Sequence, residues 1–346
     1  MSKTYLIALL AVVAAITASA QSGAPDKVTV NASDQTAARG ATKRQSHARR
    51  ATSPTARAMG SEAFTVRSSS GSSSPSGSSG VGSTNSALRG PGDLTFNGGP
   101  VVPFAVSHVI YMNPVNPSLP NGACAIAASC WGDPEGFLRD LGTSDFIHIT
   151  DQYVKTGADN RYTVDRSATV AYNSDFVGTF TDFDILATVH AVAASTGQAG
   201  YGHIYHVLLP PFQDVCASGV GCASTTICAY HGSADFFDIG HVVYSVEPDQ
   251  ISFNCAIPAP SPNGVRADSL YNVLSHELFE IVTDPDFNAW TNTTNLSLLG
   301  QEIGDECEFI DASFSFDVPT FKIGKKLYAV QREYDNRQHT CATKPD

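Results

Sequence analysis

A change in composition near residue 95 limits how much of this chain can fold. The run from Ser68 to Ser83 consists almost entirely of serine and glycine and contains no aromatic residue. Such a sequence cannot bury enough apolar surface to offset the entropy that is lost on ordering the chain. We therefore predict a disordered Ser/Gly/Arg-rich pro-segment or linker over residues 21–95, followed by a single globular domain over residues 96–346.

The first twenty residues have the pattern of an export signal. Lys3 supplies a positive charge, Tyr5 to Ile16 is almost wholly apolar, and Ala18-Ser19-Ala20 has the small-x-small form of a signal-peptidase site. An apolar core of about a dozen residues is too short to cross the roughly 30 Å of bilayer hydrocarbon. We expect residues 1–20 to be a signal peptide, and the product to be secreted to the extracellular space or cell wall without a membrane span.

The distribution of charge argues against one class of partner. Residues 1–94 carry a net charge of +6, whereas residues 95–346 carry −18. Binding to nucleic-acid phosphates requires clustered lysine and arginine, which the acidic domain lacks. We therefore expect no nucleic-acid partner, and the sequence leaves the oligomeric state open.

All the cysteines of the chain lie in the predicted domain. Their number is even, and in an exported chain an even number indicates disulfide bonds rather than a zinc–thiolate site. No paired C-x-x-C spacing is present to favour zinc. The eight positions are Cys124, Cys130, Cys216, Cys222, Cys228, Cys255, Cys307 and Cys341. We predict the pairs Cys124–Cys130 and Cys307–Cys341, with the middle four paired among themselves.

Hydrophobic periodicity within residues 96–346 predicts both strands and helices. The predicted strands cover Val101–Met112, Asp145–Thr150, Arg161–Val170, His203–Leu209, Val242–Val246 and Lys326–Arg332. The predicted helices cover Pro134–Leu141, Asp182–Ser195 and Ala267–Thr283, the last being the strongest in the chain. Strands around two main helices indicate an α/β or α+β domain, in which a mixed β-sheet is backed by helices.

The helix predicted over Ala267–Thr283 carries a pattern typical of metal sites. Its apolar residues recur at spacings of three and four, and His276 points away from that stripe. Glu280 lies one turn beyond His276 on the same face, so both can contact one ion. With Glu277 beside them, the pattern is H-E-x-x-E, which is the zincin motif H-E-x-x-H with a carboxylate in place of the second imidazole.

The chemistry of zinc explains this choice of residue types. Zinc binds imidazole nitrogen and carboxylate oxygen, and a catalytic site keeps one position for water. His276 and Glu280 are the predicted ligands, and Glu277 is the predicted general base. A third ligand is expected from Glu302 or Asp305.

Two questions about this site stay open in the sequence. Asp284 and Asp286, at the end of the helix, are rivals for the third ligand position, because spacing alone cannot choose among the four carboxylates. A site with two carboxylates is also more anionic than a zincin site, so calcium, or no metal, is the alternative to zinc.

Three other histidines offer weaker candidates. His203 and His206 lie on opposite faces of a predicted strand, so at most one of them faces any single site. His231 follows Cys228 and can line a cleft, although a lone strand histidine more often has a structural role.

Glycosylation sequons begin at Asn31, Asn292 and Asn295, and the last two are expected in an exposed loop if the host glycosylates its proteins.

Several short segments together resemble a known family. They are Tyr205 to Pro210, Cys228 to His231, Ser275 to Leu278 with Thr283-Asp284-Pro285, Asn288 to Trp290, and Glu302 to Asp305 with Cys307. In this order they resemble the phosphate-induced protein/EXORDIUM-like family, and its microbial branch more than its plant branch. The resemblance runs from about Pro100 to Cys341. It implies an extracellular or wall-associated protein, linked in plants to growth regulation.

Two functional hypotheses follow. The first is a secreted metal-dependent hydrolase with a zincin-like active-site helix, most simply a zinc peptidase acting on a peptide or a cell-wall polymer. The alternative is a non-catalytic extracellular protein of the EXORDIUM-like kind, with a structural metal site or none.

Overall fold

The computed structural model describes residues 26–29, 92–114, 130–172, 178–218, 220–258, 260–296, 298–308 and 318–346. The predicted signal peptide, Asn31 and Cys124 lie outside the described residues. Among the residues described, no helix is long and apolar enough to cross a bilayer.

Short strands outnumber helices in the described chain. The strands are β1 (Asp26–Thr29), β2 (Leu94–Phe96), β3 (Ala105–Pro114), β4 (Tyr162–Val164), β5 (Ala168–Tyr172), β6 (Phe180–Thr181), β7 (His203–Leu208), β8 (Val215–Ala217), β9 (Gly221–Cys222), β10 (Tyr230–Phe236), β11 (Gly240–Glu247), β12 (Trp290–Asn292), β13 (Thr320–Ile323), β14 (Lys326–Ala329), β15 (Glu333–Asp335) and β16 (Thr340–Ala342). The helices are α3 (Pro134–Gly142), the 3₁₀ helix η2 (Phe146–Thr150), α4 (Asp151–Val154), α5 (Asp182–Thr196), α6 (Val265–Thr283) and α7 (Asp305–Glu308).

The main sheet is mixed, as the sequence predicts. Its strands follow the order β1-β5-β3-β7-β11-β10, and β4 also pairs with β3. Every pair is parallel except the edge pair β10 and β11. Parallel strands need long crossovers, which is why helices and loops alternate with these strands along the chain.

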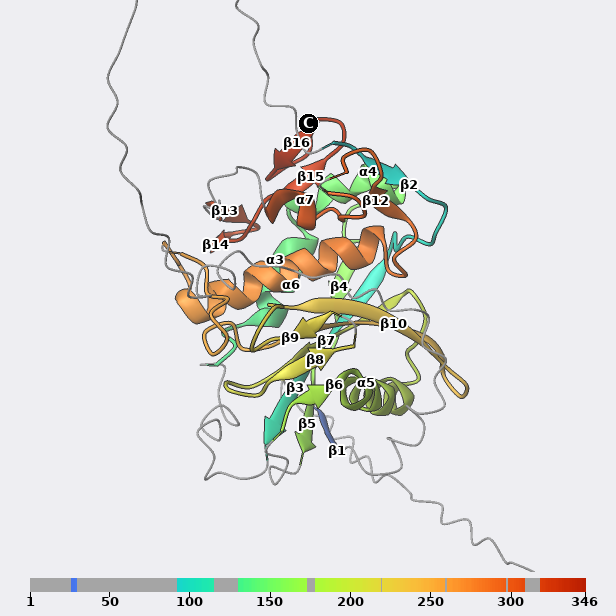
Figure 1. Cartoon of the computed structure of the whole chain (residues 1–346), viewed down its shortest axis with the longest axis vertical. Coiled ribbons are helices and arrows are strands. Elements are labelled where there is room, and N and C mark those ends of the chain that lie inside the picture. Colours follow the sequence, from blue (N-terminus) through green and yellow to red (C-terminus); the bar gives the residue numbers. More distant parts are fainter. Residues whose placement is uncertain are drawn as a thin grey trace, which may run out of the picture.

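Helices cover both faces of this sheet (Figure 1). Alternate residues of β11 show the two faces directly. Val243 packs in the core cluster that contains the apolar side of α6, whereas Val242 and Tyr244 pack in the cluster that contains α5. The result is a mixed α and β domain with a core on each face of the sheet.

The long helix α6 lies between the main sheet and the small C-terminal sheets (Figure 1). Gly264, with φ of 90°, allows the sharp entry into the helix. In the first turn, the carboxylate of Asp268 accepts hydrogen bonds from the backbone and side-chain N–H groups of Asn263. Pro285 follows the helix, whose last residue is Thr283. Its predicted apolar stripe, Leu270, Leu274, Leu278 and Ile281, is buried in the core.

Disulfide bonds support the predicted pairing where the structure describes it. Cys307 is bonded to Cys341, and the middle four cysteines pair as Cys216–Cys222 and Cys228–Cys255. Cys130 is also disulfide-bonded, and its predicted partner lies outside the described residues. Cys228 lies two residues before β10, and Cys307 belongs to α7.

Most predicted elements are confirmed, with a few corrections. Asp145–Thr150 was predicted as a strand, but Phe146–Thr150 is the 3₁₀ helix η2. This short apolar run is buried against several elements, and periodicity alone cannot separate such a strand from a buried helix. Local hydrogen bonds decide the outcome, since the Thr150 hydroxyl donates to the carbonyl oxygen of Ile147.

Other boundaries also differ from prediction. Arg161–Val170 is split into β4 and β5, and the strand predicted over Lys326–Arg332 ends at Ala329. Strand β10 was not predicted at all. Within the predicted pro-segment or linker, Asp26–Thr29 forms β1, which pairs with β5, and β2 begins at Leu94 and pairs with β12.

Candidate metal centre

Helix α6 brings an imidazole and a carboxylate together on one face. His276 and Glu280 are one turn apart, and Nε2 of His276 lies 3.1 Å from Oε1 of Glu280. Neither atom has a hydrogen-bond partner, so the two are close without the geometry of a hydrogen bond. The structure thus places these two side chains as their spacing predicts.

Asp305, the first residue of α7, completes one set of possible ligands. Its Oδ1 lies 3.9 Å from Nε2 of His276. His276, Glu280 and Asp305 each offer an atom within 4.8 Å of the others, and all three are buried. Gly304 permits this close approach, because a Cβ atom added there would lie 2.5 Å from Nδ1 of His276.

Glu302 belongs to a second set. Its Oε1 lies 3.9 Å from Nε2 of His231, and Nδ1 of His231 lies 3.4 Å from Oε2 of Glu280. His231, Glu280 and Glu302 also offer atoms within 4.8 Å of one another. Both leading candidates for the third ligand therefore lie at the site, but with different histidines.

His231 is the residue that sequence reasoning underestimated. It lies on the edge strand β10, on the face that packs against α6. A signal for this face is present in the sequence, because His231, Ser233 and Asp235 alternate with Tyr230 and Ala234. The apolar members of the strand pack on the opposite face, in the core cluster of α5. Recognition of β10 as a strand would have placed His231 toward the helix.

Glu277 reaches from α6 to β10. Its Oε2 accepts a hydrogen bond from Nδ1 of His231 at 3.2 Å, and its Oε1 has no hydrogen-bond partner. Burial raises the pKa of Glu277 to about 6, although the two neighbouring histidines oppose that rise. One oxygen of this carboxylate therefore orients His231, and the other is left for a separate role.

Glu333, on β15, is a second residue that the sequence reasoning missed. It is fully buried. Burial, followed by the nearby carboxylates of Glu280 and Asp305, raises its pKa well above the usual value. The predicted strand over Lys326–Arg332 stopped one residue before it, and no spacing rule connects it to the helix motif.

The whole cluster is buried and rich in carboxyl groups. No more than 4% of the surface of any of six residues is exposed: His231, His276, Glu277, Glu280, Glu302 and Asp305. Burial and the neighbouring Glu280 raise the pKa of Asp305 to about 7 and that of Glu302 well above its usual value. Burial alone would lower the pKa values of His231 and His276. The surrounding carboxylates outweigh this effect, so both pKa values are raised.

These shifts have a common physical cause. An ionised carboxylate loses several kcal/mol of hydration free energy when it is buried. A nearby positive charge is needed to offset that cost. The charged groups that act most strongly on Glu302, Asp305 and Glu333 are other carboxylates and the two histidines. A divalent cation bound here would supply positive charge and offset the cost of burying these carboxylates.

The two rival ligands, Asp284 and Asp286, accept hydrogen bonds from other groups. Oδ1 of Asp284 accepts hydrogen bonds from the backbone N–H groups of Asn288 and Ala289, which closes the turn after α6. Asp286 instead accepts hydrogen bonds from Ser233 and Tyr201. Neither belongs to the two ligand sets of the described residues.

His203 and His206 are also separate from the cluster. His206 is buried between the hydroxyls of Ser107 and Ser245. His203 pairs with His108, with 3.0 Å between Nδ1 of His203 and Nε2 of His108.

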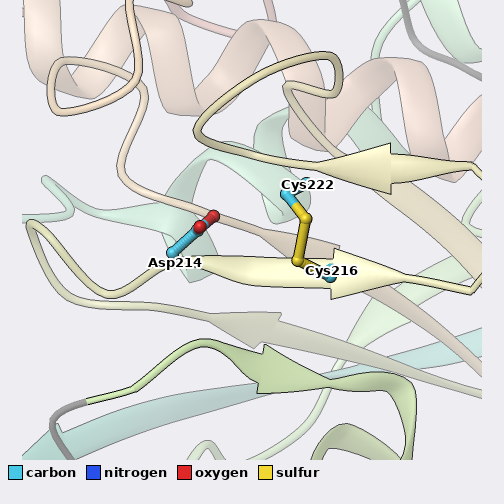
Figure 2. Close-up of side chains that lie close together, drawn as sticks. All are labelled: Asp214, Cys216 and Cys222. Carbon is cyan, nitrogen blue, oxygen red and sulfur yellow. A yellow bond between two sulfur atoms is a disulfide. The ribbon is translucent and has the colours of Figure 1, made fainter.

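One further group of residues has the spacing of metal ligands, but its two cysteines are not free to bind a metal as thiolates. Asp214, Cys216 and Cys222 offer atoms within 4.8 Å of one another. Figure 2 shows that the two sulfur atoms are joined in a disulfide between β8 and β9. The carboxylate of Asp214 accepts hydrogen bonds from the backbone and hydroxyl groups of Ser224. This group is therefore a structural crosslink.

Comparison with known proteins gives no identity for this cluster. No protein-family profile, curated protein or solved structure matches this chain. The resemblance to the phosphate-induced protein/EXORDIUM-like family therefore stays a prediction. The candidate function depends on the residues of the site alone.

Proposed function

We propose that this protein is a secreted metal-dependent hydrolase, with a zincin-like helix and a zinc ion held by His276, Glu280 and Asp305. The observation that carries the proposal is the pair on α6. Nε2 of His276 and Oε1 of Glu280 approach to 3.1 Å without a hydrogen bond. Imidazole nitrogen and carboxylate oxygen are the donor types that zinc accepts, and a catalytic zinc site has three protein ligands.

Glu277 is the proposed general base. When bound, zinc supplies Lewis acidity, which polarises a carbonyl group or lowers the pKa of water. A general base works best when its pKa is near the operating pH. Burial raises the pKa of Glu277 to about 6, and its Oε1 has no other hydrogen-bond partner. In this proposal that oxygen accepts the proton of the attacking water.

A second candidate function has its own supporting observation. Complete burial of Glu302, and near-complete burial of the other ligands, is typical of structural metal sites, which are closed to substrate. In that case the protein is a non-catalytic extracellular protein, as the EXORDIUM-like resemblance implies, and the bound ion is zinc or calcium.

Metal analysis and a cleavage assay distinguish these functions. The secreted protein is purified without chelator, and zinc and calcium are measured per chain. Hydrolysis of casein and of a peptide library is then measured before and after chelator treatment, and again after zinc is restored. Zinc together with chelator-sensitive hydrolysis supports the hydrolase. Chelator-insensitive cleavage contradicts it, and calcium without cleavage supports the second candidate.

A further inference from the structure

The two ligand sets share one residue, Glu280. Oε1 of Glu280 lies 3.1 Å from Nε2 of His276, whereas Oε2 lies on the side of His231, 3.4 Å from its Nδ1. Asp305 belongs only with His276, and Glu302 only with His231. A carboxylate that belongs to two sets of possible ligands is able to bridge two metal ions.

We propose that the centre is dinuclear, with a second divalent cation held by His231 and Glu302 and bridged to the first through Glu280. This inference rests on the proposed function, because it adds an ion to the same centre. Metal ions in two-metal hydrolytic sites are about 3.5–4 Å apart, a separation that one bridging carboxylate can span.

Glu302 gives the first independent support. Its side chain is fully buried, and neither Oε1 nor Oε2 has a hydrogen-bond partner. A buried carboxylate without partners loses its hydration and gains nothing in return. Since Oε1 faces the free ring nitrogen of His231 at 3.9 Å, an ion between these two atoms accounts for the orientation of both.

The tautomer of His231 gives the second support. Its Nδ1 donates to Glu277, which leaves Nε2, a buried nitrogen with no partner, directed toward Glu302. Metal-binding histidines almost always donate their other N–H group to a carboxylate, a carbonyl or water. His231 has this arrangement, with Glu277 as the orienting carboxylate.

The charge of the cluster also fits two ions better than one. Five buried carboxylates surround the two histidines, namely Glu277, Glu280, Glu302, Asp305 and Glu333. If all five are ionised, one divalent cation leaves most of their charge without compensation, whereas two nearly balance it. Ligand sets of one imidazole and two carboxylates suit zinc or manganese. A pair of such ions stabilises both the attacking and the leaving oxygen of a hydrolytic displacement, as in phosphatases, nucleases and aminopeptidases.

Metal stoichiometry tests the proposal. The full secreted protein is stripped with chelator, reloaded with Zn²⁺, desalted, and analysed for zinc per chain. We expect two zinc ions in the wild type and one in Glu302→Gln. Glu306→Gln is the matched control, because Glu306 is a buried carboxylate of the same segment that accepts a hydrogen bond from Asn292 and belongs to neither set. It is expected to keep both ions.

The outcomes separate the two proposals. One zinc ion in the wild type overturns the dinuclear centre and leaves the mononuclear hydrolase standing, whereas no bound zinc overturns both.

A second measurement uses only the wild type, and so it applies even if Glu302→Gln does not fold. After loading with Mn²⁺, a bridged pair gives an exchange-coupled electron paramagnetic resonance spectrum. The six-line spectrum of isolated Mn²⁺ at full loading contradicts the proposal.

Discussion

Nδ1 of His231 lies 3.2 Å from Oε2 of Glu277, and this hydrogen bond joins the edge strand β10 to helix α6 across 46 residues of sequence. The contact fixes the ring of His231 and uses only one oxygen of Glu277. The other oxygen is buried without a partner. The same carboxylate therefore has two roles in the proposed centre, as an orienting group and as a base.

Glu277→Gln tests the base role. Glutamine preserves the size of the side chain and still accepts a hydrogen bond from His231 through its carbonyl oxygen, but it cannot take up a proton. Turnover is expected to fall at least about a hundredfold, while the zinc at His276 and the melting temperature stay nearly unchanged. Steady-state kinetics with metal analysis of the same sample give the readout. Unchanged cleavage in this variant would falsify the catalytic role of Glu277.

His276→Ala should behave differently, because it removes a ligand. The variant is expected to bind no zinc between Glu280 and Asp305, so added zinc should no longer raise its melting temperature through that site. His148→Ala is the control, since His148 is a half-buried histidine that contacts Asp151, far from the cluster in sequence. Differential scanning calorimetry with and without zinc compares the two. An equal zinc response in both variants would count against the ligand assignment.

Gly304→Ala tests the packing that brings Asp305 to His276. The added Cβ atom would lie 2.5 Å from Nδ1 of His276, so the ring or the segment must move. We expect zinc affinity to fall at least about tenfold, since changes around metal ligands typically cost 10–100-fold. Gly202→Ala is the matched control, because nothing lies within 4 Å of its added Cβ. Competition with a chromogenic zinc chelator measures both affinities, and equal values contradict the prediction.

The pair of His108 and His203 predicts a pH dependence of stability. Burial, followed by the neighbouring His203, lowers the pKa of His108 to about 4. The unfolded chain, with a histidine pKa of about 6.5, therefore takes up this proton first as the pH falls. The contribution to the free energy of unfolding is complete above that pH and is lost progressively toward pH 4, by up to about 3 kcal/mol.

Urea denaturation of the wild type and of His108→Asn, at about pH 7 and about pH 5, isolates this contribution. Asparagine does not titrate, so the variant should lose less stability between the two pH values than the wild type does. The same loss in both proteins would show that His108 is not responsible.

Asn292 should carry no glycan, in contrast to the exposed position expected from its sequon. The side chain is fully buried on β12, and its Nδ2 atom donates a hydrogen bond to Oε1 of Glu306 at 2.6 Å. Attachment of a sugar to this nitrogen would break the bond and force the strand apart. Peptide mapping of protein secreted from a eukaryotic host checks this, and an occupied Asn292 would contradict the described packing.

The sequence predicts the helical part of the site well. Spacing alone places His276 and Glu280 on one face, and the end of the helix before Pro285 is confirmed. This succeeds because helical geometry relates residues three and four apart without reference to the rest of the fold.

The remainder of the site depends on tertiary structure. Spacing could not separate Glu302 from Asp305, because their distances to the two histidines depend on how the segment before α7 packs. His231 and Glu333 come from strands far from the helix in sequence, and no local rule connects them to it. The mixed sheet was predicted, but η2 and β10 were not. Periodicity does not separate a short buried strand from a buried helical turn, and Gly232 weakens the alternation along β10.

The wide separation of the site residues along the chain has a consequence for when the proposed centre could take up metal. His231 lies on β10, His276 on α6 and Asp305 on α7, so no chain that ends before α7 contains both ligand sets. Sites of this kind do not exist in unfolded chains. In the proposed centre, metal would therefore bind only after β10, α6 and the segment around α7 have packed together. Metal occupancy would then report that a molecule has finished folding, and a chain trapped at an earlier stage would be inert.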